Sequence, residues 1–172
     1  MRKELFQPSI ESEARILMLI NAFTTSTKSL EGRTKLAKLD FLLRYPSFMQ
    51  RALAIRTSNQ SMKVASEEQD NIEGRMIRYR YGPWDPSYYA ILGRLIGKGL
   101  VETVPNQRGL SYRTTDQGKH IAKALAKEDS WQETNVRVKL LKQNFNLSGN
   151  ALKDFIYQHF PEVTSASWGQ KL

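Results

Sequence analysis

The spacing of apolar residues along the chain predicts mostly helices. Between Ser9 and Ala22 apolar side chains recur three and four residues apart, which predicts a first helix with Ser9 as its N-cap. A second helix is expected from about Thr34 to Tyr45, because Pro46 disfavours helical geometry in the residue before it. Pro46 itself suits the first turn of a third helix.

Residues 82–118 have the pattern of a helix, a strand, a turn, a second strand and the start of another helix. Asp85 is placed to cap the first of these helices, with Pro86 in its first turn and Gly99 at its end. Residues 100–104 are the first predicted strand. The residues that alternate on the returning strand are Leu110, Tyr112 and Thr114. This order predicts a winged helix-turn-helix, a fold that serves both for reading DNA and for joining larger protein complexes.

The remaining segments add helices, one short strand and two stretches without periodicity. Residues 57–71 are polar and predict a mobile loop. Alternation over residues 76–81 predicts a third strand of the wing sheet, or a hairpin beside it. Two helices are expected at 131–145 and from about Ser148, and residues 161–172 have the composition of a loose tail.

The expected fold class is mainly α with a small antiparallel β wing, in the form of a winged helix-turn-helix core with extra C-terminal helices. Thr115 or Asp116 is expected to cap the helix that follows the wing. The predicted organisation is a winged helix-turn-helix domain at 1–128, a C-terminal helical extension at 129–160, and a tail at 161–172.

The amino-acid composition indicates what class of protein this is and where in the cell it is expected. The chain has 172 residues, 40% of them hydrophobic, which is enough to bury a core. It has no cysteine, so disulfides and thiolate metal sites are excluded and an intracellular location is the simplest expectation. The apolar stretch Ile16 to Ile20 is too short to cross a membrane, and the first residues lack the order of a secretory signal. We expect a cytoplasmic protein with no membrane partner.

The net charge is +9, and the basic excess is concentrated in two stretches. Residues 31–60 hold six basic side chains against two acids, and residues 83–128 hold seven against four. The predicted nucleic-acid-binding residues are Arg33, Lys35, Lys38, Arg44, Arg94, Lys98, Arg108 and Arg113. An excess that coincides with the helix-turn-helix and wing is expected if that face meets phosphate, although a solvated basic surface has the same pattern.

Signals for catalysis are nearly absent from the sequence. His120 and His159 are the only histidines, and they lie on different predicted helices without a carboxylate or nucleophile at a catalytic spacing. The glycines of GRLIGKGL lack the order of a phosphate-binding loop. The densest acidic group, at 67–73, falls in the predicted loop and is a poor candidate for a metal site. We expect neither an enzyme nor a bound cofactor or metal.

The predicted recognition helix, between Pro86 and Gly99, is poor in side chains that read bases. Arginine, asparagine and glutamine form paired hydrogen bonds in the major groove, and this helix offers only Arg94 and Lys98 as basic groups. Its aromatic and small residues favour close approach by another protein. The predicted partner-binding residues are Trp84, Tyr88, Tyr89, Arg78 and Arg80.

Two blocks carry a family resemblance, GRTKLAKLDFLLRYP at 32–46 and YGPWDP at 81–86. With the wing and its TDQG, which many winged-helix proteins share, they resemble the small middle component of bacterial ABC-three-component defence systems. That group includes the Lamassu accessory subunit, and the resemblance covers residues 5 to about 128.

The resemblance implies a non-catalytic winged-helix adaptor in an anti-phage defence complex. Its implied partners are an SMC-like ATPase subunit and an effector subunit, often a nuclease, which the adaptor helps to assemble and restrain. Sequence-nonspecific DNA contact would accompany this role. The alternative left open by the residues is a stand-alone winged-helix transcriptional regulator that binds DNA.

Overall fold

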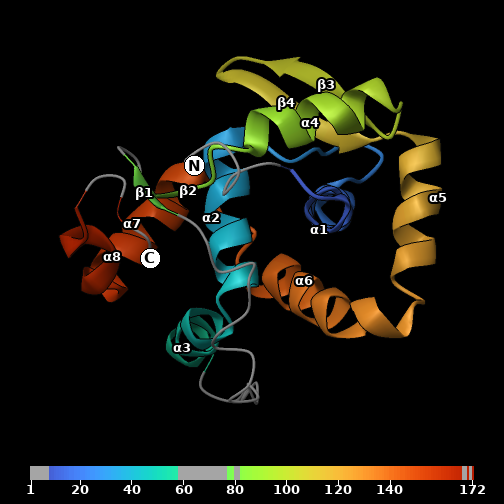
Figure 1. The fold of residues 1–172 in the computed structure, drawn as a ribbon. Coiled ribbons are helices and arrows are strands. Elements are labelled where there is room, and N and C mark those ends of the chain that lie inside the picture. The colour runs from blue at the N-terminus through green and yellow to red at the C-terminus, as the bar shows by residue number, and fades with distance from the viewer. Residues whose placement is uncertain (1–7, 58–76, 80–81, 168–169, 171) are drawn as a thin grey trace.

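The computed structural model describes residues 8–57, 77–79, 82–167, 170 and 172. Within these residues the chain is mainly helical with a small antiparallel sheet, which confirms the expected class at this level (Figure 1). The first helices are α1 (Ile10–Phe23), α2 (Gly32–Arg44) and α3 (Pro46–Arg56). The elements that follow are β1 (Ile77–Tyr79), β2 (Gly82–Trp84), α4 (Tyr88–Gly97), β3 (Val101–Asn106), β4 (Gly109–Thr114) and α5 (Asp116–Leu125). A 3-10 turn (Asp129–Trp131) leads to α6 (Gln132–Asn144), α7 (Gly149–His159) and α8 (Pro161–Ser165).

Three hydroxyl side chains start helices as the sequence predicted. Ser9 Oγ accepts from the Ser12 amide at 3.1 Å at the start of α1. Thr115, one of the two candidates for α5, accepts from the Gly118 amide at 3.0 Å. Ser148 caps α7. Each bond satisfies an amide in a first helical turn that has no partner within the helix, so local sequence suffices to define these ends.

Helix α4 begins later than predicted. Asp85 Oδ1 accepts from the Ser87 amide at 2.8 Å and also from the Ser87 hydroxyl, so Asp85, Pro86 and Ser87 form a turn before the helix starts at Tyr88. The predicted side-chain acceptor is therefore correct, but its bond closes a turn instead of capping the helix. Gly99 follows the helix with a φ of 71°, a left-handed conformation that glycine adopts readily.

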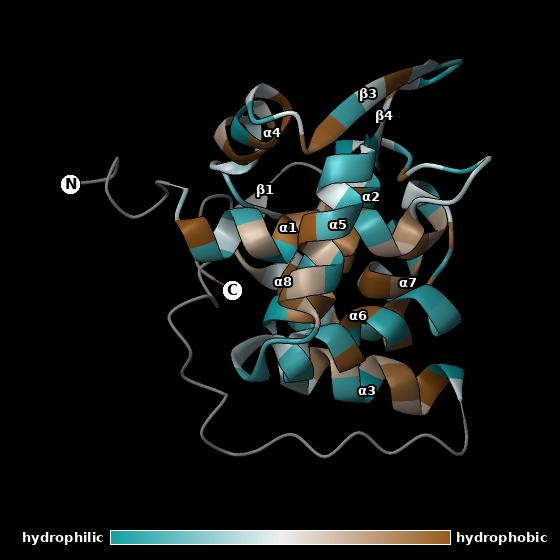
Figure 2. Cartoon of the chain, turned by 90° about the vertical axis from the view of Figure 1, so that its right-hand side faces the viewer, coloured by the Kyte–Doolittle hydropathy of each residue, from teal (hydrophilic) through white to brown (hydrophobic). Residues whose placement is uncertain are grey.

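Strands β3 and β4 form the predicted hairpin, with Val101 opposite Thr114 and Asn106 opposite Gly109. The hairpin lies beside α4, and its tip projects beyond the helices (Figures 1 and 2). Leu30, just before α2, exchanges two backbone hydrogen bonds with Tyr112, at 2.8 and 2.9 Å.

The strand predicted at 76–81 does not join this sheet. Its described part, β1, pairs with β2 in a separate two-stranded antiparallel sheet, with Tyr79 opposite Gly82, so the alternative prediction of a hairpin describes this segment better. The edge of Tyr112 that a third wing strand would use is already occupied by Leu30. The predicted loop at 57–71 lies outside the described residues, apart from Thr57.

Helices α6 and α7 share one core with α1 and α2. Helix α1 packs on α5 and α6, and α2 packs on α7 and α6. In Figure 1, α2 runs through the middle of the molecule with α7 to one side and α6 to the other. Buried side chains of this core include Ile16, Ile20, Leu36, Leu39, Leu141, Phe145, Leu152 and Ile156.

The expected loose tail is partly a helix. Pro161 opens α8, and Val163 and Ala166 are buried. Val163 belongs to the same apolar cluster as the helical core, which explains why the segment is held in place. Trp168 lies outside the described residues. In the part of the chain that the structure describes, no helix has the length and apolar character needed to cross a bilayer.

Candidate nucleic-acid interface

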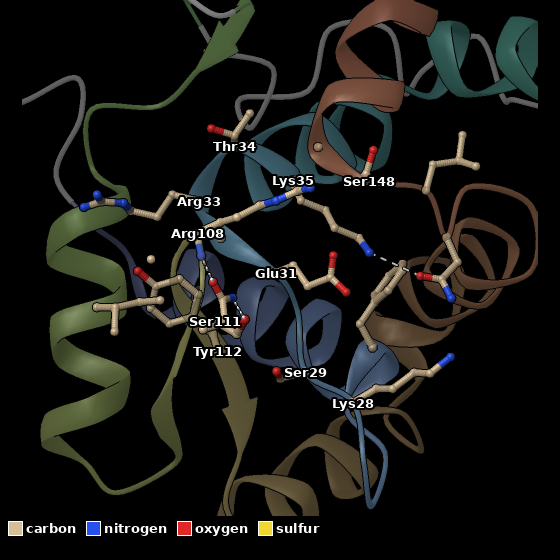
Figure 3. A pocket seen from close by; sticks show the side chains of 18 of the residues that line it. Lys28, Ser29, Glu31, Arg33, Thr34, Lys35, Arg108, Ser111, Tyr112 and Ser148 are labelled. Atoms are coloured by element: carbon tan, nitrogen blue, oxygen red, sulfur yellow. Dashed lines mark hydrogen bonds between the residues drawn. The ribbon is translucent and has the colours of Figure 1, made fainter.

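A large open cleft, of about 1020 Å³, lies between three parts of the chain that are distant in sequence (Figure 3). One wall is the segment 27–35, which leads into α2 and forms its first turn. The second wall is the tip of the β3–β4 hairpin and strand β4, and the third is the end of α6 with its connection to α7. We call this region the basic cleft.

The described residues that line the basic cleft are strongly biased in charge. Five of them are basic and one, Glu31, is acidic. The basic residues are Lys28, Arg33, Lys35, Arg108 and Lys142. Figure 3 shows Glu31 among these side chains, between Lys35 and Lys28. A concave surface with one sign of charge raises the local concentration of ligands with the opposite charge.

Three lysines of the cleft crowd one another. Lys35 is only 4% exposed, and its Nζ donates to Asn146 Oδ1 at 3.2 Å. Its ammonium lies 5.3 Å from the centre of the Phe23 ring, and that of Lys142 lies 4.8 Å from the same ring. Aromatic faces attract cations, so Phe23 holds both groups in place.

Burial, and after it the repulsion between these lysines, lowers the pKa of Lys35 and Lys142. Burial lowers the pKa of Lys35, Glu31 raises it, and the charges of Lys142 and Lys28 lower it further. Burial and Lys28 likewise lower the pKa of Lys142. An anion in the cleft would relieve this repulsion between like charges.

Two helices begin at the cleft. Helix α2 starts at Gly32 with no side-chain cap from Glu31, and α7 starts at Gly149. These two starts are in contact, because a Cβ on Gly149 would lie 3.3 Å from the Lys35 amide nitrogen. First-turn amides and the helix dipole favour negative charge at such ends, which adds to the charge of the lysines.

Only some of the predicted nucleic-acid-binding residues lie in the basic cleft. The structure brings Arg33, Lys35 and Arg108 together in the basic cleft. Lys38 lies further along α2 and is 1% exposed. Lys28 and Lys142 also line the cleft, but the sequence did not predict them. The segments around them have almost no net charge, and only the fold brings them close to Lys35.

Arg94, Lys98 and Arg113 are engaged in ion pairs. Arg94 Nη1 lies 3.3 Å from Glu13 Oε1, and Lys98 Nζ bonds the other oxygen of the same buried carboxylate. These contacts fasten α4 to α1. Arg113 lies near Glu102, with 3.5 Å between Nε and Oε1.

Arg44 is buried in a network that joins α1, α2 and the turn before α4. Its Nη1 lies 2.6 Å from Asp85 Oδ2 and 3.6 Å from Asp40 Oδ2. Arg15 Nε donates to Asp40 Oδ1 at 2.8 Å, and the Tyr88 hydroxyl donates to Asp40 Oδ2 at 2.6 Å. Burial raises the pKa of Asp40, but Arg15 and Arg44 outweigh it and hold that pKa below its ordinary value. Arg44 and Tyr88 therefore stabilise the core, and neither presents the surface contact expected from the sequence.

The other predicted partner-binding residues are only partly described. Tyr89 is 60% exposed, and the Arg33 guanidinium lies 4.5 Å from its ring centre. Trp84 is half-buried, 6.1 Å from the Tyr89 ring. Arg78 belongs to strand β1, whereas Arg80 lies outside the described residues.

Among the described residues, no three or more histidine, aspartate or glutamate side chains gather where they could hold a metal ion. The acidic group at 67–73 lies outside these residues. His120 is exposed, and the ring of His159 lies 4.7 Å from that of Phe155.

Comparison of the chain with protein-family models, with curated proteins and with solved structures found no match.

Proposed function

We propose that this protein is a non-catalytic winged-helix adaptor that contacts the nucleic-acid backbone, without reading its sequence, through the basic cleft. The observation that carries the backbone contact is the crowding of Lys28 and Lys35, from the segment that leads into α2, with Lys142 of α6. Phosphate is the anion that such a concave, multiply charged surface fits, since backbone binding is driven by neutralisation of phosphates.

The order of elements supports the winged-helix assignment. A helix, a short extended segment at Leu30, two helices and a hairpin follow one another as α1, Leu30, α2, α4 and β3–β4, with α3 and β1–β2 inserted. The pairing of Leu30 with Tyr112 supplies the third strand position of a wing sheet. Helix α4 then corresponds to the recognition helix.

The exposed face of α4 argues against sequence reading. Its exposed residues are Tyr89, Ala90, Gly93, Arg94, Ile96 and Gly97. Asparagine and glutamine are absent from that face, and Arg94 is bonded to Glu13. A stand-alone regulator would need base-reading groups here, so the adaptor is the better supported of the two functions.

The adaptor role itself rests on the resemblance to the small component of ABC-three-component defence systems. In that role the protein would bind an SMC-like ATPase and an effector, and would help to assemble and restrain the effector. A tagged chain should then copurify from its host with an ATPase and an effector. Recovery instead of a symmetric dimer that protects one palindromic DNA site would support the regulator.

The backbone contact is tested by replacing exposed charges of the cleft. Lys28→Gln with Arg108→Gln should weaken binding of a fluorescent duplex about tenfold or more at low salt, because two phosphate contacts are lost. The plot of log affinity against log salt should become shallower by about 1 to 2, as expected for two contacts. Fluorescence anisotropy over a salt series measures both.

Two further variants sharpen this test. Lys119→Gln with Lys123→Gln removes the same charge from exposed positions on α5 and should change affinity much less. Glu31→Gln removes the acidic group of the cleft and should tighten binding. Equal losses in the α5 and cleft variants would show that net charge, and not the cleft, binds the nucleic acid.

A further inference from the structure

A small pocket of about 190 Å³ opens beside the basic cleft. Its lining residues are Arg33, Thr34, Lys38, Gly82, Pro83, Trp84 and Tyr89. We call it the Tyr89 pocket. Arg33 and Thr34 line both cavities, so a ligand that lies in the cleft can reach the pocket without leaving the surface.

The walls of the Tyr89 pocket suit a flat aromatic group. Tyr89 contributes a mostly exposed ring, and Trp84 meets it edge-on at an interplanar angle of 61°. The Arg33 guanidinium lies over the Tyr89 ring. Aromatic rings and guanidinium planes are the surfaces on which unpaired bases stack. Tyr89 is not required by the core, since the neighbouring Tyr88 fills the buried position.

Polar groups of the same pocket can meet the edge of a base. The Thr34 side chain is exposed, and Lys38 lines the pocket from within the protein. Burial and, to a smaller extent, the charge of Lys153 lower the pKa of Lys38 to about 8. The Thr34 hydroxyl can donate to a base carbonyl or accept from a base amino group.

We propose that the ligand of the basic cleft is a single-stranded nucleic acid, and that one of its unpaired bases enters the Tyr89 pocket and stacks on Tyr89. The phosphates lie in the basic cleft, and Arg33 links the two sites. Bases of a duplex stack on one another and stay inside the helix, so a duplex can use only the cleft. This inference rests on the proposed backbone contact.

The test compares ligands that differ only in their bases. A twelve-nucleotide oligothymidylate, an abasic strand of the same length and a duplex are titrated into the 172-residue chain, with anisotropy as the readout. The wild type should bind the oligothymidylate about tenfold more tightly than the abasic strand, in keeping with the stacking of one base. Tyr89→Ala should abolish that difference and leave abasic and duplex binding unchanged.

Two controls separate stacking from general effects. Tyr89→Phe keeps the ring and should keep the preference for bases. Ile96→Ala removes another exposed apolar side chain of α4 and should change nothing. Equal affinities of the wild type for the two strands, or equal losses on both in Tyr89→Ala, would overturn the inference. In that outcome the proposed backbone contact stands if all ligands still bind with the expected salt dependence, and it fails if none binds.

Discussion

Lys38 shows how far the surroundings of one residue can change its chemistry. Its side chain is almost fully buried on α2, and its Nζ lies close to Gly82, where an added Cβ would be 3.4 Å away. Burial and Lys153 lower its pKa from 10.5 to about 8. A group whose pKa is lower in the folded chain than in the unfolded chain destabilises the folded protein at pH values where the group is protonated.

This pKa shift predicts a dependence of stability on pH. Between about pH 8 and 10.5 the unfolded state holds the Lys38 proton more tightly than the folded state does. The free energy of unfolding should therefore rise with pH in this window, by about 3 kcal/mol from this group. The measurement is urea denaturation across pH of the wild type and of Lys38→Met, which keeps an unbranched side chain, one atom shorter, without the charge.

The difference between these two proteins isolates Lys38, because every other titrating group is common to both. Lys123→Met removes an exposed lysine from α5 and should show no comparable trend relative to the wild type. A constant difference between the wild type and Lys38→Met from pH 7 to 10.5 would mean that the buried ammonium is not perturbed as described.

At the scale of elements, α5 is positioned by the backbone that follows α4. The Thr115 amide donates to the Leu100 carbonyl at 3.1 Å, and the Thr115 hydroxyl donates to the Gly99 carbonyl at 2.6 Å. Gly118 lies against Leu100 so closely that an added Cβ would be 1.9 Å from its carbonyl oxygen. No side chain fits at 118 unless α5 moves.

Two glycine-to-alanine substitutions test this packing with opposite signs. Gly118→Ala should destabilise the protein by about 2–3 kcal/mol, because the added methyl group clashes with rigid backbone. Gly93→Ala, on the exposed side of α4 with no atom within 4 Å of the new Cβ, should stabilise it by about 0.5–1 kcal/mol. Chemical denaturation of the two variants measures both changes. A Gly118→Ala protein as stable as the wild type would disprove the close contact of α5 with Leu100.

The ends of helices were the most predictable features of the elements. Ser9, Thr115 and Ser148 each cap a helix because the bond involved reaches only three residues along the chain. The start of α4 was less predictable, since the side chain of Asp85 also takes part in the buried network with Arg44 and closes the preceding turn. Long-range contacts of this kind are not visible in local patterns.

At the scale of the whole molecule, the C-terminal helices form part of the hydrophobic core and are not a separate extension of it. Leu141 and Phe145 of the α6 end, Leu152 and Ile156 of α7, and Phe160 are all fully buried in the same cluster as α1 and α2. Without them, apolar surface of α1 and α2 would be open to water.

Truncation tests this dependence. A chain ending at residue 128 should fail to form a cooperative fold, since burial of several large side chains is worth about 1.5–3 kcal/mol each and would be lost together. Circular dichroism and thermal melting would show a broad or absent transition. A chain that lacks only residues 1–7 should melt cooperatively, because the Ser9 cap of α1 is retained. A cooperative transition in residues 1–128 alone would instead support an independent N-terminal domain.

The sequence by itself determined most of the helices, the β3–β4 hairpin and the concentration of basic charge in two stretches, because periodicity, caps and turn residues act over a few positions. It could not determine which basic side chains line the cleft and which are buried in the core. Arg44 and Lys38 lie in a basic stretch yet are buried, whereas Lys28 and Lys142 come from nearly neutral segments and meet at Lys35. The tertiary structure decided this, since burial and the repulsion between charges depend on distances across the folded chain.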